Sequence, residues 1–121
     1  MPDPIEWEQT IFQLILHAGS ARSAAKEAAC MADDGKWQEA EAMLAEANNE
    51  QTDAHKINTN IITRAARGEA MDFSVLLVHA LDLLMLAWSE IDYTEQYIKM
   101  SKRIAELEKE VEKWRSQLST K

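Results

Sequence analysis

The chain has 121 residues, of which 46% are hydrophobic, and a formal net charge of −8. This length predicts one domain with a single core, and the scarcity of proline and glycine indicates a helical protein rather than a disordered or all-β one. The negative charge argues against non-specific binding to nucleic acid or to anionic membranes, because both need clustered lysine and arginine.

Cys30 is the single cysteine, so an internal disulfide is excluded. No signal peptide precedes Ile5, and a reducing cytoplasm is therefore the expected location. Cys30 lies among alanines in a helical pattern, and we expect it to be a small residue of the core.

The first helix is predicted to begin at Asp3-Pro4, where Asp3 can cap and proline suits the first helical position. Gly35 is expected to end it, because glycine readily adopts the left-handed conformation that follows a helix. Within it, apolar residues spaced by three and four form one seam: Ile11, Leu14, Ala18, Ala21, Ala25 and Ala28.

A second helix is predicted from about Trp37 to Arg67, with Gly68 ending it. Its seam consists of Ala40, Leu44, Ala47, Ala54, Ile61 and Ala65, interrupted by Gln51 and Asn58. Polar residues in a seam can fix the register of packed helices.

The third predicted helix runs from a cap at Asp72 to Lys121 without proline or glycine. Its first part, residues 73–88, is apolar apart from Ser74, His79 and Asp82. This run is too short and too polar to cross a membrane, so we expect a helix that other helices enclose on nearly every side.

His79 and Asp82 are three residues apart and therefore share one face of the helix. A carboxylate buried there without a partner would cost several kcal/mol, as buried unpaired ions do. Either a partner subunit, a metal ion or a catalytic role must account for Asp82.

The rest of the third helix carries a heptad stripe from Tyr93 to Leu118, with Ile104, Val111 and Leu118 as a positions. In a parallel homo-oligomer, Arg103 would face Glu108 of a neighbour, and Glu110 would face Arg115. Self-association is favoured over a helix folded back on its own chain, because no fourth helix remains to cover the stripe.

Four segments resemble the lactose/cellobiose-specific enzyme IIA family of the bacterial phosphotransferase system, in the order and spacing of that family. They are Phe12–Ser23, Trp37–Ala42, Ala54-His55 and Phe73–Ala80. The resemblance covers roughly residues 5–98, and its most specific part is the Leu-Val-His-Ala sequence that ends at Ala80.

The resemblance implies an all-α fold: an up-down-up antiparallel bundle of three helices that assembles as a homotrimer of nine helices. It implies that His79 accepts a phosphoryl group from the phosphocarrier HPr and passes it to enzyme IIB during sugar uptake. It further implies that Asp82 meets its two symmetry mates on the threefold axis, where a divalent cation such as magnesium would join them. The IIA-like domain would span residues 1–102, and residues 103–121 would be a coiled-coil-like extension.

The chain departs from the family around Asp82. Where the family usually has His-(Ala or Gly)-Gln-Asp-His-Leu-Met, this chain has leucine at positions 81 and 83. Leucine cannot donate the hydrogen bonds that glutamine and histidine offer to a phosphorylated imidazole. Leu81, Leu83 and the extended heptads leave an alternative open, namely a catalytically silent, engineered homotrimeric scaffold for assembly.

The two other histidines are assigned structural roles. His17 follows an apolar run in the first helix and is expected at the edge of the core, although it could also line a partner groove near His79. His55 lies in the second helix, and the resemblance slightly favours a place near the phosphorylation site.

Overall fold

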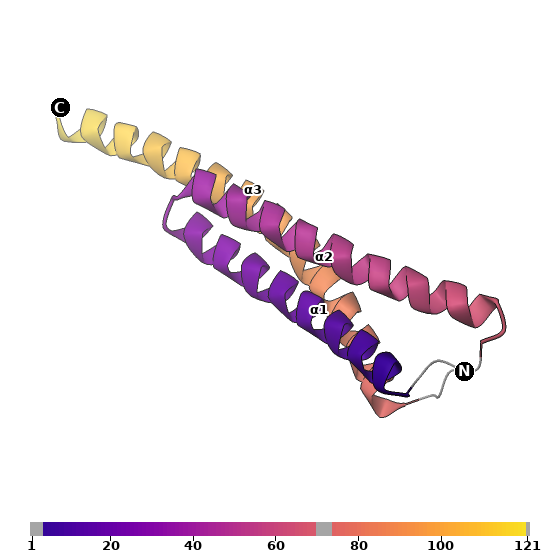
Figure 1. The fold of residues 1–121 in the computed structure, drawn as a ribbon. Helices are drawn as coiled ribbons and strands as arrows, with labels where there is room; N and C mark the ends of the chain where they lie inside the picture. The colour runs from indigo at the N-terminus through magenta and orange to yellow at the C-terminus, as the bar shows by residue number, and fades with distance from the viewer. Residues whose placement is uncertain (1–3, 70–73, 121) are drawn as a thin grey trace.

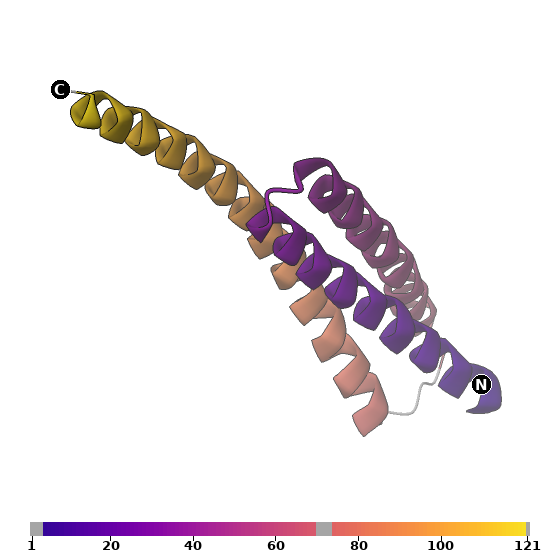
Figure 2. The same ribbon diagram turned by 90° about the vertical axis from the view of Figure 1, so that its left-hand side faces the viewer.

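The computed structural model describes residues 4–69 and 74–120, with side chains from Glu6 onward. They form three long helices: α1 (Pro4–Asp33), α2 (Trp37–Ala66) and α3 (Val75–Ser119). Helix α2 runs antiparallel to α1, α3 runs back along both, and the last part of α3 projects beyond the other two (Figures 1 and 2). The predicted all-α, up-down-up arrangement with a long C-terminal helix is confirmed.

Both turns use glycine as predicted. Gly35 has a φ of 74° and Gly68 a φ of 85°, values in the left-handed region that side-chain-bearing residues rarely adopt. Beyond each glycine the chain bonds back to the helix: the Lys36 N–H donates to the Met31 carbonyl at 2.9 Å, and the Glu69 N–H to the Arg64 carbonyl at 3.2 Å. Such bonds satisfy carbonyls that a helix end leaves free.

The cap of α3 differs from the prediction. Ser74 is the N-cap, and its hydroxyl oxygen accepts a hydrogen bond from the Leu77 N–H at 3.1 Å. Serine takes this role because its short side chain reaches a free N–H of the first turn. Asp72 and Asp3, the caps expected from the sequence, lie outside the described residues. Within the described part of the chain, no helix is long and apolar enough to cross a membrane.

The core changes in character along the bundle. Near the start of α1 it contains large side chains, including Ile11 and Leu14, which pack with Leu84 of α3. Towards the turn between α1 and α2 it consists mainly of alanines from all three helices, with Ile91 and Ile98 between them. Helices approach more closely where the residues between them are small. The whole predicted seam of α1 is buried.

Two residues predicted for the core lie at the surface. Cys30 is exposed, because it lies two residues after Ala28, on a different face of the helix from the buried seam. Ala65 is also exposed, since the buried part of α2 ends at Ile61. Gln51, by contrast, is buried at its predicted place in the α2 seam.

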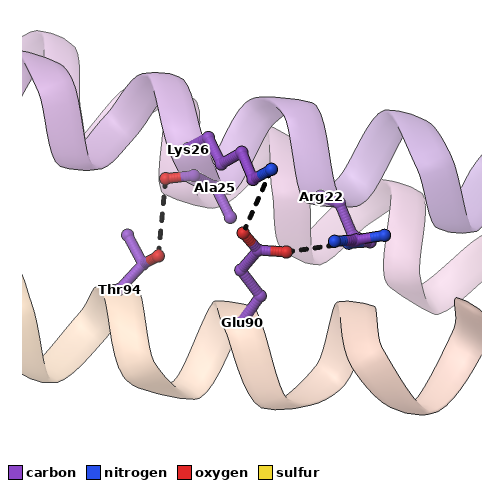
Figure 3. Close-up of polar contacts among 5 residues, drawn as sticks. All are labelled: Arg22, Ala25, Lys26, Glu90 and Thr94. Atoms are coloured by element: carbon purple, nitrogen blue, oxygen red, sulfur yellow. Dashed lines mark hydrogen bonds and ion pairs between the residues drawn. The ribbon is translucent and has the colours of Figure 1, made fainter.

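A polar cluster fixes the rotation of α3 against α1 (Figure 3). The Arg22 Nε donates to Glu90 Oε2 at 2.8 Å, and the Lys26 ammonium lies 4.0 Å from the other oxygen of that carboxylate. One turn further, the Thr94 hydroxyl donates to the Ala25 carbonyl at 3.4 Å. These contacts determine which face of α3 is turned away from the bundle.

Tyr97 links α3 to the end of α1, and this contact predicts an alkaline titration. Its hydroxyl donates a hydrogen bond to the Asp33 carboxylate, which raises the pKa of Tyr97 above the ordinary value of about 10. The folded chain therefore holds this proton more tightly than the unfolded chain, so the contribution to stability is present below about pH 10 and is lost as pH rises through the folded pKa.

The Tyr93→Phe variant isolates this titration, because Tyr97 is then the single tyrosine. Absorbance of the phenolate should show a midpoint above pH 10, and adding Asp33→Asn should lower it. An unchanged midpoint in the Asn variant would contradict the assignment.

Candidate functional site

His79 and Asp82 lie near the beginning of α3, and both side chains are exposed in the single chain. Within residues 6–69 and 74–120, no hydrogen bond or ion pair reaches either side chain. The expectation that α3 is enclosed on nearly every side is therefore not met within one chain. The described residues of one subunit supply neither shelter nor a partner for the Asp82 carboxylate.

The geometry of α3 separates a buried face from an exposed apolar face. At about 100° per residue, its buried residues point about 120° or more away from Asp82. They are Ala80, Leu84, Ala87, Ile91, Thr94 and Ile98. Apart from Trp88, which points about 120° away, the large exposed apolar residues of α3 fall within about 60° of the Asp82 direction. They are Val75, Val78, Met85, Leu86, Tyr93, Met100, Ile104, Leu107, Val111, Trp114 and Leu118. We call this surface the outer apolar face.

Asp82 lies at the centre of the outer apolar face, and His79 lies at its margin, about 60° to one side. An exposed apolar surface of this length is typical of a protein contact site rather than of a monomer surface. Asp82 therefore lies within this exposed apolar surface, and His79 lies at its edge.

Leu81 and Leu83 help to hold α3 on the body of the chain. Leu81 packs against the core cluster that contains Leu14 and Leu84, and Leu83 packs against the alanine-rich cluster that contains Ile91. Both leucines are half-buried and flank Asp82 on its two sides. Their apolar character is therefore explained by packing within the subunit.

His17 is half-buried at the edge of the core, as predicted, and pairs with α2. Its Nδ1 lies 2.7 Å from Glu50 Oε2, and the two side chains are partly exposed. Together with Asp53 they offer three ligand atoms within 4.8 Å of one another, a set that could hold a metal ion. The sequence prediction placed a cation at Asp82 and missed this group, which requires the α1–α2 register to be known.

His55 packs against Trp88 of α3, with ring centroids 5.3 Å apart and planes inclined by 51°. This contact joins α2 to α3 and agrees with a structural role. Among the three histidines, His79 alone combines exposure with a place beside the outer apolar face.

Comparison with known proteins decides the family. A family model described as "PTS system, Lactose/Cellobiose specific IIA subunit" matches residues 9–102. The chain belongs to this family. The match includes His79 and Asp82 and ends where α3 leaves the other two helices, so the projecting part of α3 lies outside it.

Other members of the family are similar to this chain over most of their length. The chain is 41% identical over 101 residues to the lichenan-specific phosphotransferase enzyme IIA component of Bacillus subtilis, covering 84% of this chain and 92% of that protein. It is 39% identical over 95 residues to the oligo-beta-mannoside-specific EIIA component of the same organism, covering 78% and 86%. These similarities to natural components do not support the alternative that the chain is an engineered derivative.

Solved structures of family members share the fold. A cellobiose-specific enzyme IIA from Bacillus anthracis superposes with a TM-score of 0.81 at 39% identity, covering 87% of this chain and 94% of that one. Two chains from solution structures of IIA(Chitobiose)–HPr complexes, one of them from Escherichia coli, superpose with TM-scores of 0.73 and 0.67. Both are 27% identical and cover 82% of this chain and 96% of the other.

Proposed function

We propose that this IIA subunit is a phosphocarrier that accepts a phosphoryl group from HPr on His79 and passes it to enzyme IIB in the uptake of lactose- or cellobiose-type sugars. The observation that carries the proposal is the exposed His79 within the region matched by the family model. The similarity to a IIA chain solved in complex with HPr supports HPr as the donor. A cytoplasmic location is proposed with it.

A phosphocarrier must both accept and release the phosphoryl group, so the bond between phosphorus and His79 must form and break readily. A neutral imidazole is a nucleophile near pH 7. As the bond from phosphorus to its donor atom on HPr breaks, a bond from phosphorus to a ring nitrogen of His79 forms. The resulting phosphoramidate then passes its group to a cysteine thiolate of enzyme IIB. No hydrogen bond within the described residues occupies the His79 ring, so a partner can approach it.

The outer apolar face supports assembly as a homotrimer. Contact between copies through this face would cover residues such as Val75 and Met85, which are exposed in the single chain. Three Asp82 carboxylates would then converge near the axis and repel one another unless a hard cation such as magnesium joined them. His79, at the margin of the face, would remain accessible.

Incubation of the wild-type chain with phosphoenolpyruvate, enzyme I and HPr tests the proposal. We expect about one phosphoryl group per chain, labile in acid and stable in base as a phosphoramidate is, and dependent on HPr. Addition of a IIB component should discharge it. A folded chain that takes up no label would contradict the proposal and would favour the alternative of a catalytically silent scaffold, for which the self-complementary outer face is the specific observation.

A further inference from the structure

The last part of α3, residues 103–119, is an extension that the described residues of its own chain cover only at its beginning. The turn between α1 and α2 reaches α3 only as far as Ala105 and Glu108, where Asp33, Gly35 and Trp37 line a shallow groove with them. From residue 106 to residue 120 every side chain is exposed, and the helix projects away from the bundle (Figures 1 and 2).

The extension continues the outer apolar face. Five of its apolar side chains are between 51% and 69% exposed and are spaced by three, four, three and four residues: Ile104, Leu107, Val111, Trp114 and Leu118. This spacing places them at alternating a and d positions of heptads. They form a straight seam on the same side of α3 as Asp82.

The charges beside this seam are complementary to a second copy of the chain. In a parallel, in-register pair, the g residue of one helix lies near the e residue of the next heptad in its neighbour. Arg103 would then face Glu108, and Glu110 would face Arg115. A slip by one heptad would set Arg103 against Arg115 and Glu110 against Glu108, and both of those pairs repel. The charge pattern therefore selects one register.

We propose that the extension packs against the same segment of other copies as a parallel, in-register coiled coil, which holds the assembled subunits together beyond the Asp82 layer. The inference rests on the self-association in the proposed function and deepens it. The a and d residues of the extension are compatible with a coiled coil of two helices as well as one of three. The extension therefore does not determine how many subunits assemble, and the rest of the outer apolar face sets that number.

Charge reversal in the full chain tests the seam. The double variant Arg103→Glu/Arg115→Glu makes all four charged e and g positions acidic, and Glu108→Arg/Glu110→Arg makes these four positions basic. Sedimentation equilibrium should show at least a tenfold rise in the dissociation concentration of each variant alone, and recovery on mixing the two. Lys109→Glu/Lys113→Glu is the matched control for the acidic variant, because it makes the same charge change at positions that face away from the seam.

Disulfide trapping tests the direction and register. In a Cys30→Ser background, Leu118→Cys should cross-link to its own copy under mild oxidation, whereas Ser116→Cys, on the far side of the helix, should not. Circular dichroism establishes that the helices of each variant are intact.

The outcomes separate this inference from the proposed function. Unchanged association of both charge variants, or equal cross-linking of the two cysteines, would overturn the coiled coil while phosphorylation of the same variants leaves the carrier function standing. A wild-type chain that stays monomeric at all concentrations would overturn the coiled coil as well. Loss of the phosphoryl label with assembly retained would overturn only the carrier function.

Discussion

Replacement of His79 by asparagine is expected to abolish transfer of the phosphoryl group from HPr to this chain. Asparagine keeps a polar side chain of similar size but has no ring nitrogen able to form the phosphoramidate. His79 is exposed and has no hydrogen-bond partner among the described residues, so the fold should be unaffected. The measurement is the amount of label per chain after incubation with phosphoenolpyruvate, enzyme I and HPr.

His17→Asn and His55→Asn are the matched controls, because the chain has three histidines in all. Each control removes an imidazole that pairs within the subunit, with Glu50 or with Trp88. We expect both to retain the full stoichiometry of label, with at most a modest loss of stability. Label on the His79→Asn chain, or its loss in only one of the controls, would move the acceptor to a different histidine.

The sequence predicted the three helices and most of their buried seams because local signals and packing agree. Alanines spaced by three and four residues can be buried only where helices approach closely, and Ala18, Ala21, Ala25 and Ala28 are all buried. Glycines 35 and 68 end helices because the backbone there is left-handed. The cap at Ser74 was missed because Asp72 and Ser74 are both favourable caps, and the sequence alone does not choose between them.

The sequence singled out His79 and Asp82 of α3 because their surroundings are apolar. It did not predict that both side chains are exposed in the single chain. Periodicity shows that two residues share a face; it does not show whether that face meets the same chain or another one. The structure resolves this for α3, because α1 and α2 cover the side that carries Leu84 and Ile91 and leave the Asp82 side open.

The pairing of His17 with Glu50 shows what sequence reasoning could have found with one further step. In an antiparallel hairpin, residues at equal distances from the turn face each other. His17 lies 18 residues before Gly35 and Asp53 lies 18 residues after it, with Glu50 one turn nearer to Gly35. Matching distances would therefore have predicted that His17 lies beside these two carboxylates. The third ligand of the group, Asp53, follows because it is one turn from Glu50.

Replacement of Asp82 by leucine is expected to stabilise the assembled protein when no divalent cation is present. If three carboxylates converge on an axis, each must be taken out of water beside two like charges, and well-packed apolar residues in place of buried charges commonly gain about 1–4 kcal/mol. The wild-type protein should have a higher melting temperature with magnesium than with a chelator. The Asp82→Leu variant should have the same melting temperature under the two conditions, close to that of the wild type with magnesium.

Glu95→Leu is the control, because it removes a carboxylate from the same helix on a side turned about 140° away from Asp82. Its loose pairing with Lys99, at 3.8 Å, is worth little at the surface, so it should leave the magnesium dependence intact. A leucine variant at position 82 that is less stable than wild type under chelation, or still responds to magnesium, would show that Asp82 does not meet its symmetry mates.

The group of His17, Glu50 and Asp53 would then be the remaining candidate for a cation site among the described residues. In that case Asp53→Asn would be expected to remove the response to magnesium, since it deletes one ligand without breaking the pair between His17 and Glu50.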